Sequence, residues 1–209
     1  MAVTPVSAQE KPGDSALTAR NVFERINVAA LDLLPQTARL DMLDYWDVDS
    51  VYRVKNALGG QSWLERVDPD WVRINVTPVS TLDVKLLPVK GGEVVMTIVT
   101  TGGEGQARDS SVAFYDAQTL APLEASRYFT PPALGSFFSI PKGSATSMKE
   151  IREMFPFTTV EYVLTPGSDA IEARLTSGEF ISVDDWNIAK LFLRPEVKAA
   201  WKGKYKFDK

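Results

Sequence analysis

Four aspartates, Asp41, Asp44, Asp47 and Asp49, are the side chains whose spacing most resembles a site for chemistry. On a helix Asp41 and Asp44 share one face, and Asp47 and Asp49 could offer oxygen ligands to a hard cation such as Ca²⁺. The segment lacks the glycine and the distal glutamate of an EF-hand loop. We therefore interpret it as the solvated face of an amphipathic helix and predict no metal site.

The residue types that most enzymes use for catalysis near neutral pH are missing. The chain contains no Cys and no His, which excludes thiolate nucleophiles, zinc–cysteine sites, iron–sulfur clusters and Ser–His–Asp catalysis. Carboxylate pairs, a lysine of lowered pKa, tyrosine or an oxygen-ligated cation would remain available. We predict a protein without catalytic residues and without a cofactor.

A glycine-rich segment, Gly102-Gly103-Glu104-Gly105, could be read as a phosphate-binding loop. Such a loop needs Lys and Ser or Thr after its glycines, at the start of a helix. Here Gln106-Ala107-Arg108 leads into a predicted strand, so we interpret the segment as a hairpin loop that could serve as a contact loop.

The C-terminal segment mixes lysines with aromatic residues: Lys198, Trp201, Lys202, Lys204, Tyr205, Lys206, Phe207 and Lys209. This mixture can bind nucleic acid or acidic sugars, but it is also typical of an edge strand that buries its aromatics and uses lysines against edge-to-edge pairing. We favour the edge strand. The formal net charge of −4 gives no field for a polyanion, so nucleic acid is not an expected partner.

Four aromatic residues, Tyr128, Phe129, Phe137 and Phe138, flank Pro131-Pro132. Aromatics on a loop could form a binding surface for a peptide or a glycan. They could also fill the junction between two lobes. We favour the interpretation that the four rings fill this junction, and we keep them as the candidate binding surface.

Residues 1–14 are predicted to be a flexible leader or the remnant of a signal peptide. Val6-Ser7-Ala8 before Gln9 places small residues where signal peptidase accepts them. A disordered tail is the alternative. We expect an exported protein, periplasmic or extracellular, and no membrane span, since no run approaches the roughly 20 apolar residues that one requires.

Hydrophobic spacing predicts an α+β fold in which N-terminal helices pack on an antiparallel meander. Helical spacing covers about 15–27 and 37–46, and Val51, Val54 and Leu58 continue it. From Val72 onward apolar and polar residues alternate; Leu82, Val84 and Leu86, for example, alternate with Asp83 and Lys85. This alternation predicts strands with one buried face and one wet face, and Gly91-Gly92 predicts a tight hairpin.

The pattern recurs in shortened form after Pro131-Pro132, where regular structure is expected to break. Ser147 and Glu150 form a capping box that predicts a helix, and strands are expected at 158–164 and 170–175. We predict a first lobe over 15–130 and a smaller α+β lobe over 131–209, two halves that are similar in pattern.

Several short blocks resemble the family of domain of unknown function 3256. The first is Ala19-Arg20-Asn21-Val22-Phe23, and the others are Arg39–Tyr45, Asn56–Gly60, Phe114–Asp116 and Glu153–Phe157. The resemblance implies an exported protein of Bacteroidales and an α+β fold similar to β-lactamase-inhibitor-like modules. It implies no activity and no catalytic residues.

These features favour a non-catalytic binding or scaffolding module for a protein or another cell-envelope component, acting through one sheet face and its loops. The alternative is a glycan-binding or glycan-processing accessory protein. It would use aromatics such as Trp63, Trp71 or Tyr128 together with a carboxylate pair.

Overall fold

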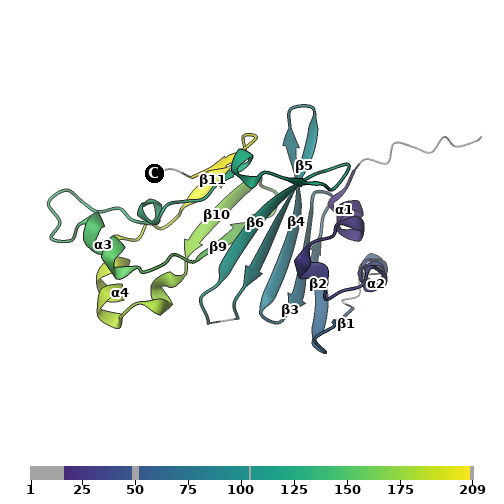
Figure 1. Cartoon of the computed structure of the whole chain (residues 1–209), viewed down its shortest axis with the longest axis horizontal. Helices are drawn as coiled ribbons and strands as arrows, with labels where there is room; N and C mark the ends of the chain where they lie inside the picture. Colours follow the sequence, from purple (N-terminus) through teal and green to yellow (C-terminus); the bar gives the residue numbers. More distant parts are fainter. Residues whose placement is uncertain (1–16, 49–51, 104, 208–209) are drawn as a thin grey trace, which may run out of the picture.

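The computed structural model describes residues 17–48, 52–103 and 105–207 (Figure 1). It confirms the α+β class, with N-terminal helices followed by a strand meander. The predicted leader 1–14 lies outside the described residues. None of the described helices has the length and apolarity needed to cross a membrane.

The meander is a seven-stranded antiparallel sheet in which every strand pairs with its neighbours in sequence. Its strands are β1 (Val54–Lys55), β2 (Gln61–Val67), β3 (Trp71–Thr77), β4 (Ser80–Val89), β5 (Gly92–Thr101), β6 (Asp109–Asp116) and β7 (Pro122–Leu123). Val89 pairs with Gly92, so the β4–β5 turn contains only Lys90 and Gly91. Gly91 has a φ of 91°, which a residue with a Cβ rarely adopts. The predicted tight hairpin is therefore present.

The N-terminal helices cover one face of this sheet, at one end of the molecule (Figure 1). They are α1 (Ala19–Arg25), a 3₁₀ turn (Ala29–Leu31) and α2 (Gln36–Asp47). Phe23 of α1 and Leu43 of α2 are fully buried in one cluster with Ile74, Leu82 and Val84 of the sheet. The helical spacing in the sequence thus marks the stripe that the helices bury.

The predicted helix through Val51, Val54 and Leu58 is wrong in the described part. Val54 and Lys55 form β1 and pair with β2. The side chain of Asn56 then accepts hydrogen bonds from the N–H groups of Leu58 and Gly60, which holds a turn where helix was expected.

The second half adds a smaller antiparallel sheet with the strand order β11-β10-β9, and helices α3 and α4 lie at the end of the molecule opposite α1 and α2 (Figure 1). The helices and the strands of this sheet in the second half are α3 (Met148–Met154), β9 (Val160–Leu164), β10 (Ala170–Leu175), α4 (Val183–Ala189) and β11 (Lys198–Ala200). Four 3₁₀ turns lie between or beside them: Ala125–Arg127, Leu134–Phe137, Ser177–Phe180 and Lys190–Phe192. The predicted capping box of Ser147 and Glu150 begins α3.

The two halves share one hydrophobic cluster on the sheet face opposite α1 and α2. Met96 and Phe114 of the meander belong to it together with Tyr162, Ile171 and Tyr205 of the second half. Two short strands also join the halves, because β8 (Phe129–Thr130) pairs in parallel with β12 (Tyr205–Lys206).

A seam of side-chain hydrogen bonds joins the two sheets. Asp109 Oδ1 accepts the backbone N–H of Val160 at 3.1 Å, and Ser110 Oγ accepts that of Tyr162 at 3.0 Å. The seam gives these two strand N–H groups partners, so β9 is held beside β6 without a backbone ladder between the two strands.

The expected wet face of β4 is covered, which corrects the prediction of one buried and one solvated face. Asp83 is 1% exposed and Lys85 is 3% exposed. The ammonium of Lys85 forms ion pairs with Asp70, beside the start of β3, and with Asp169 at 3.2 Å, in the β9–β10 turn. A buried charge is tolerated only when it is paired, so this triad ties the second half to the centre of the meander.

Asp83 is the other buried charge on this face. Its Oδ1 accepts a hydrogen bond from the indole N–H of Trp71 at 2.8 Å, and Arg73 Nη1 lies 3.1 Å from its Oδ2. Burial raises the pKa of Asp83, whereas Arg73 and Trp71 favour the charged form. The raised pKa makes part of the protein's stability depend on pH.

We predict that the side-chain carboxyl signal of Asp83 titrates by NMR above the ordinary range of an aspartate. Arg73→Gln should raise that pKa further, because it removes the charge that favours the carboxylate. A pKa raised on folding stabilises the fold below the unfolded pKa and loses that contribution as pH rises through the folded pKa. The free energy of unfolding should therefore fall over this interval relative to Asp83→Asn. Asp116, whose pKa is lowered, is the internal control, and an Asp83 pKa at or below the ordinary value would contradict the prediction.

We predict that Asp70→Ala and Asp169→Ala are non-additive. Each single change leaves Lys85 one partner and should cost about 1 kcal/mol, whereas the double change leaves a buried ammonium unpaired and should cost roughly 3 kcal/mol. Urea unfolding measures both. Adding Lys85→Met to the double variant should recover most of the loss; additive costs without that recovery would show that the triad does not hold the sheets.

Candidate binding site

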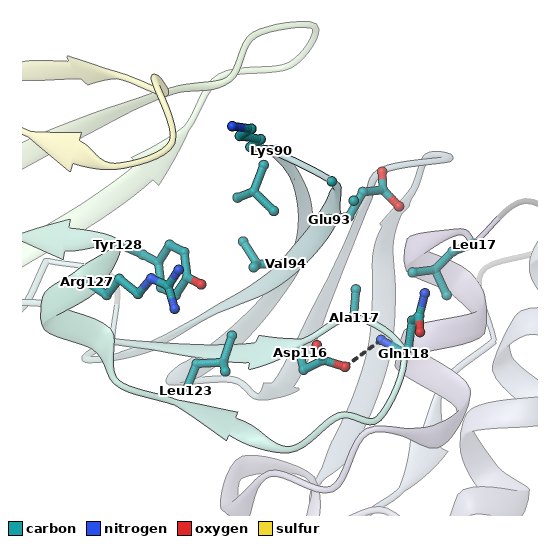
Figure 2. A pocket seen from close by; sticks show the side chains of 13 residues that line it. Leu17, Lys90, Glu93, Val94, Asp116, Ala117, Gln118, Leu123, Arg127 and Tyr128 are labelled. Atoms are coloured by element: carbon teal, nitrogen blue, oxygen red, sulfur yellow. Dashed lines mark hydrogen bonds between the residues drawn. The ribbon is translucent and has the colours of Figure 1, made fainter.

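A cavity of about 550 Å³ lies at the end of the sheet where the β4–β5 and β6–β7 turns meet (Figure 2). The 3₁₀ turn Ala125–Arg127 and Tyr128 close one side, and Leu17 borders the other. Alternate hairpin turns of an antiparallel meander lie at the same end of the sheet, and the β4–β5 and β6–β7 turns are separated by two strands, so the topology brings these segments together.

The floor of the cavity is apolar and belongs to the protein core. Val94 and Tyr128 line it and are both buried. The ring of Tyr128 stacks on Phe114 with centroids 5.2 Å apart, and Trp201 lies 6.5 Å from it. Because the floor is packed from below, its shape is fixed before any ligand arrives.

The rim carries both signs of charge on separate sides. Figure 2 shows Lys90 and Arg127 on one side of the cavity, with Glu93 and Asp116 on the other. The guanidinium of Arg127 lies 5.3 Å from the centroid of the Tyr128 ring, a cation–π contact that places it at the floor's edge. The cavity therefore presents an apolar base between a basic and an acidic side.

Asp116 is held in place by its own turn. Its Oδ1 accepts hydrogen bonds from the N–H groups of Gln118 at 3.1 Å and Thr119 at 2.8 Å, and from the Thr119 hydroxyl at 2.9 Å. These bonds lower the pKa of Asp116, with the Thr119 N–H as the largest cause. Leu120 completes the turn with a φ of 57°, uncommon for a residue other than glycine. The carboxylate of Asp116 is thus charged at neutral pH and preorganised.

The four aromatics of the predicted binding surface do not form an exposed platform. Tyr128, Phe129, Phe137 and Phe138 are 8%, 8%, 2% and 3% exposed, and all belong to the shared hydrophobic cluster. Large apolar rings are more stable out of water, and here both halves of the chain cover them. Tyr128 still borders the cavity above, and Phe138 borders a second cavity.

The acidic residues of α2 form no metal site within the described residues, where no cluster of three potential ligands is found. Asp47 binds Arg20 through two hydrogen bonds of 2.6 and 2.8 Å, and this contact lowers the pKa of Asp47. Asp41 and Asp44 are exposed, whereas Asp49 lies outside the described residues.

The aromatics considered for glycan binding are mostly covered. Trp71 and Tyr128 are buried, and the guanidinium of Arg53 lies 4.3 Å from the centroid of the half-buried Trp63 ring. Glu65 and Asp83 both bind Arg73, so these two carboxylates are already engaged by one cation.

Sequence analysis did not predict the charged residues of the rim, Lys90, Glu93, Asp116 and Arg127. Charged residues beside a Gly-Gly turn read as an ordinary solvated hairpin. The available signal was topological, since turns separated by two strands return to the same end of a meander.

Three comparisons place the chain among known proteins. A profile of the family described as "Protein of unknown function (DUF3256)" matches residues 14–207. A search of curated proteins finds no significant match. A solved structure described as a domain of an uncharacterized protein from Porphyromonas gingivalis W83 has a TM-score of 0.75 at 18% identity, and the match covers 90% of this chain and 96% of that chain.

At that identity the structural likeness shows a shared fold alone. The family match spans all the described residues and confirms the resemblance of the sequence blocks. The chain therefore belongs to the DUF3256 family.

Proposed function

We propose that the protein is an exported, non-catalytic binding module whose cavity at the end of the sheet takes an extended segment of a partner polypeptide. The observation that carries the proposal is the combination of an apolar floor with a rim of separated charges. A volume of about 550 Å³ lies within the range of protein ligand sites.

A peptide matches this chemistry because it can carry apolar and charged side chains at a fixed spacing. One apolar side chain would lie on Val94 and Leu123. An acidic residue would then face Lys90 and Arg127, and a basic residue would face Asp116. Charge complementarity of this kind sets the direction in which the peptide binds.

A glycan accessory role receives less support from the same geometry. Sugar rings stack on open aromatic faces, but Tyr128 is buried on Phe114. The rim offers two cations and two carboxylates, which suits a ligand that carries both charges. We therefore favour the polypeptide.

We predict that peptide display on the whole protein enriches sequences with an apolar residue between an acidic and a basic residue. Leu123→Trp, which fills the cavity from its side, should weaken an enriched synthetic peptide by roughly tenfold or more, since it removes the buried apolar contact. Arg127→Glu should weaken binding of that peptide. Binding to this variant should return when the acidic residue of the peptide is changed to lysine. Calorimetry measures the affinity of each protein variant for each peptide.

Lys142→Glu is the matched control, because this exposed lysine lies outside the residues that line the cavity. Enrichment of peptides that bind wild type and Leu123→Trp equally would overturn the proposed site. Failure to enrich any peptide, with circular dichroism showing a folded protein, would overturn the polypeptide as ligand.

We also predict export with cleavage after Ala8. Fractionation of the native cells followed by N-terminal peptide mass spectrometry should find a periplasmic or extracellular protein that begins at Gln9. A cytoplasmic protein that retains residues 1–8 would contradict export and would leave the binding proposal to its own test.

A further inference from the structure

A second cavity, of about 440 Å³, lies in the other half of the chain, between the 3₁₀ turn Leu134–Phe137 and α3. Apolar side chains make up most of its lining: Ala133, Phe138, Ile140 and Met148. Arg152 is the one charged residue that lines it. This cavity shares no lining residue with the one proposed to take a peptide.

The wall formed by residues 133–140 is anchored from behind. Phe138 packs on Phe155 with centroids 5.7 Å apart. The backbone carbonyl of Phe138 accepts a hydrogen bond from Arg194 Nε at 3.1 Å, and the N–H of Ser139 donates to Phe192 at 2.8 Å. These contacts attach the wall to Phe155, directly after α3, and to the segment 192–194.

Gly135 keeps part of the cavity open. A Cβ at this position would lie 3.8 Å from Met148 Sδ, in ordinary van der Waals contact. A larger side chain would extend beyond that contact into the space that a ligand would use, so position 135 offers a way to fill the cavity.

Arg152 lies one helical turn after Met148 and therefore on the same side of α3. Its guanidinium is exposed and forms no ion pair within the part of the chain that the structure describes, whereas Lys149 of the same helix pairs with Glu153. Guanidinium groups match carboxylates with two parallel hydrogen bonds.

We propose that this cavity binds a free fatty carboxylate, with its acyl chain on the apolar lining and its head group on Arg152. A neutral apolar ligand would leave the cation unused, and a cationic amphiphile would meet it with like charge. No carboxylate side chain lines the cavity among the described residues, so a ligand carboxylate meets no repulsion from the lining.

The test uses laurate as the probe and the full chain as the protein, below the concentration at which laurate aggregates. Calorimetry should show that laurate binds, dodecanol binds more weakly and dodecyltrimethylammonium binds least. Arg152→Gln should lower the affinity for laurate by roughly tenfold, the usual scale of a hydrogen bond to a charged group. It should leave the affinity for dodecanol unchanged. Gly135→Leu should lower the affinity for laurate and for dodecanol to the same degree.

Lys149→Gln is the matched control, since it removes a cation from the same helix that does not line the cavity. Ala133→Trp fills the cavity from its exposed rim if Gly135→Leu fails to fold. The proposal would be overturned if laurate did not bind, or if it bound Gly135→Leu and Ala133→Trp as tightly as wild type. An equal loss of affinity for laurate and dodecanol in Arg152→Gln would overturn the role of the arginine.

Discussion

The fold depends on neutralising two charges on a sheet face that the rest of the chain covers. Lys85 and Asp83 project from the middle of β4 into the region between the two halves. Either group unpaired would oppose burial of the whole face. Asp169 reaches Lys85 from the β9–β10 turn, so the position of the second sheet over the first is set by an ion pair as well as by apolar packing.

The same packing makes the cavity at the end of the sheet possible. Tyr128 and Val94 are core residues on one side and cavity lining on the other. The rim side chains extend from turns that strand pairing and the Asp116 hydrogen bonds hold in place. Binding residues on a rigid scaffold lose little freedom when a ligand arrives. A change in the core should therefore alter the site without touching the rim.

Local pattern predicts much of this architecture, because the meander and the N-terminal helices follow apolar spacings of two and of three to four residues. It fails where distant segments decide the outcome. Val54 has helical spacing but joins the sheet edge. Asp83 and Lys85 alternate as a wet face, yet both are buried, and Lys85 pairs with Asp169, which lies more than eighty positions later in the chain. Tyr128 was a candidate by type, whereas the charged rim depends on which turns meet in space.

The parallel pair of β8 with β12 has a consequence for how the protein is made. Residues 205–206 complete a contact with residues 129–130 and bring Tyr205 and Phe207 into the shared core. During vectorial synthesis, the meander and β8 can emerge long before β12 exists. Until then the shared cluster lacks Tyr205 and Phe207, and their aromatic neighbour Phe129 lacks this part of its packing. A chaperone that recognises exposed aromatics has its target in this interval, and the arrival of the C-terminal strand ends it.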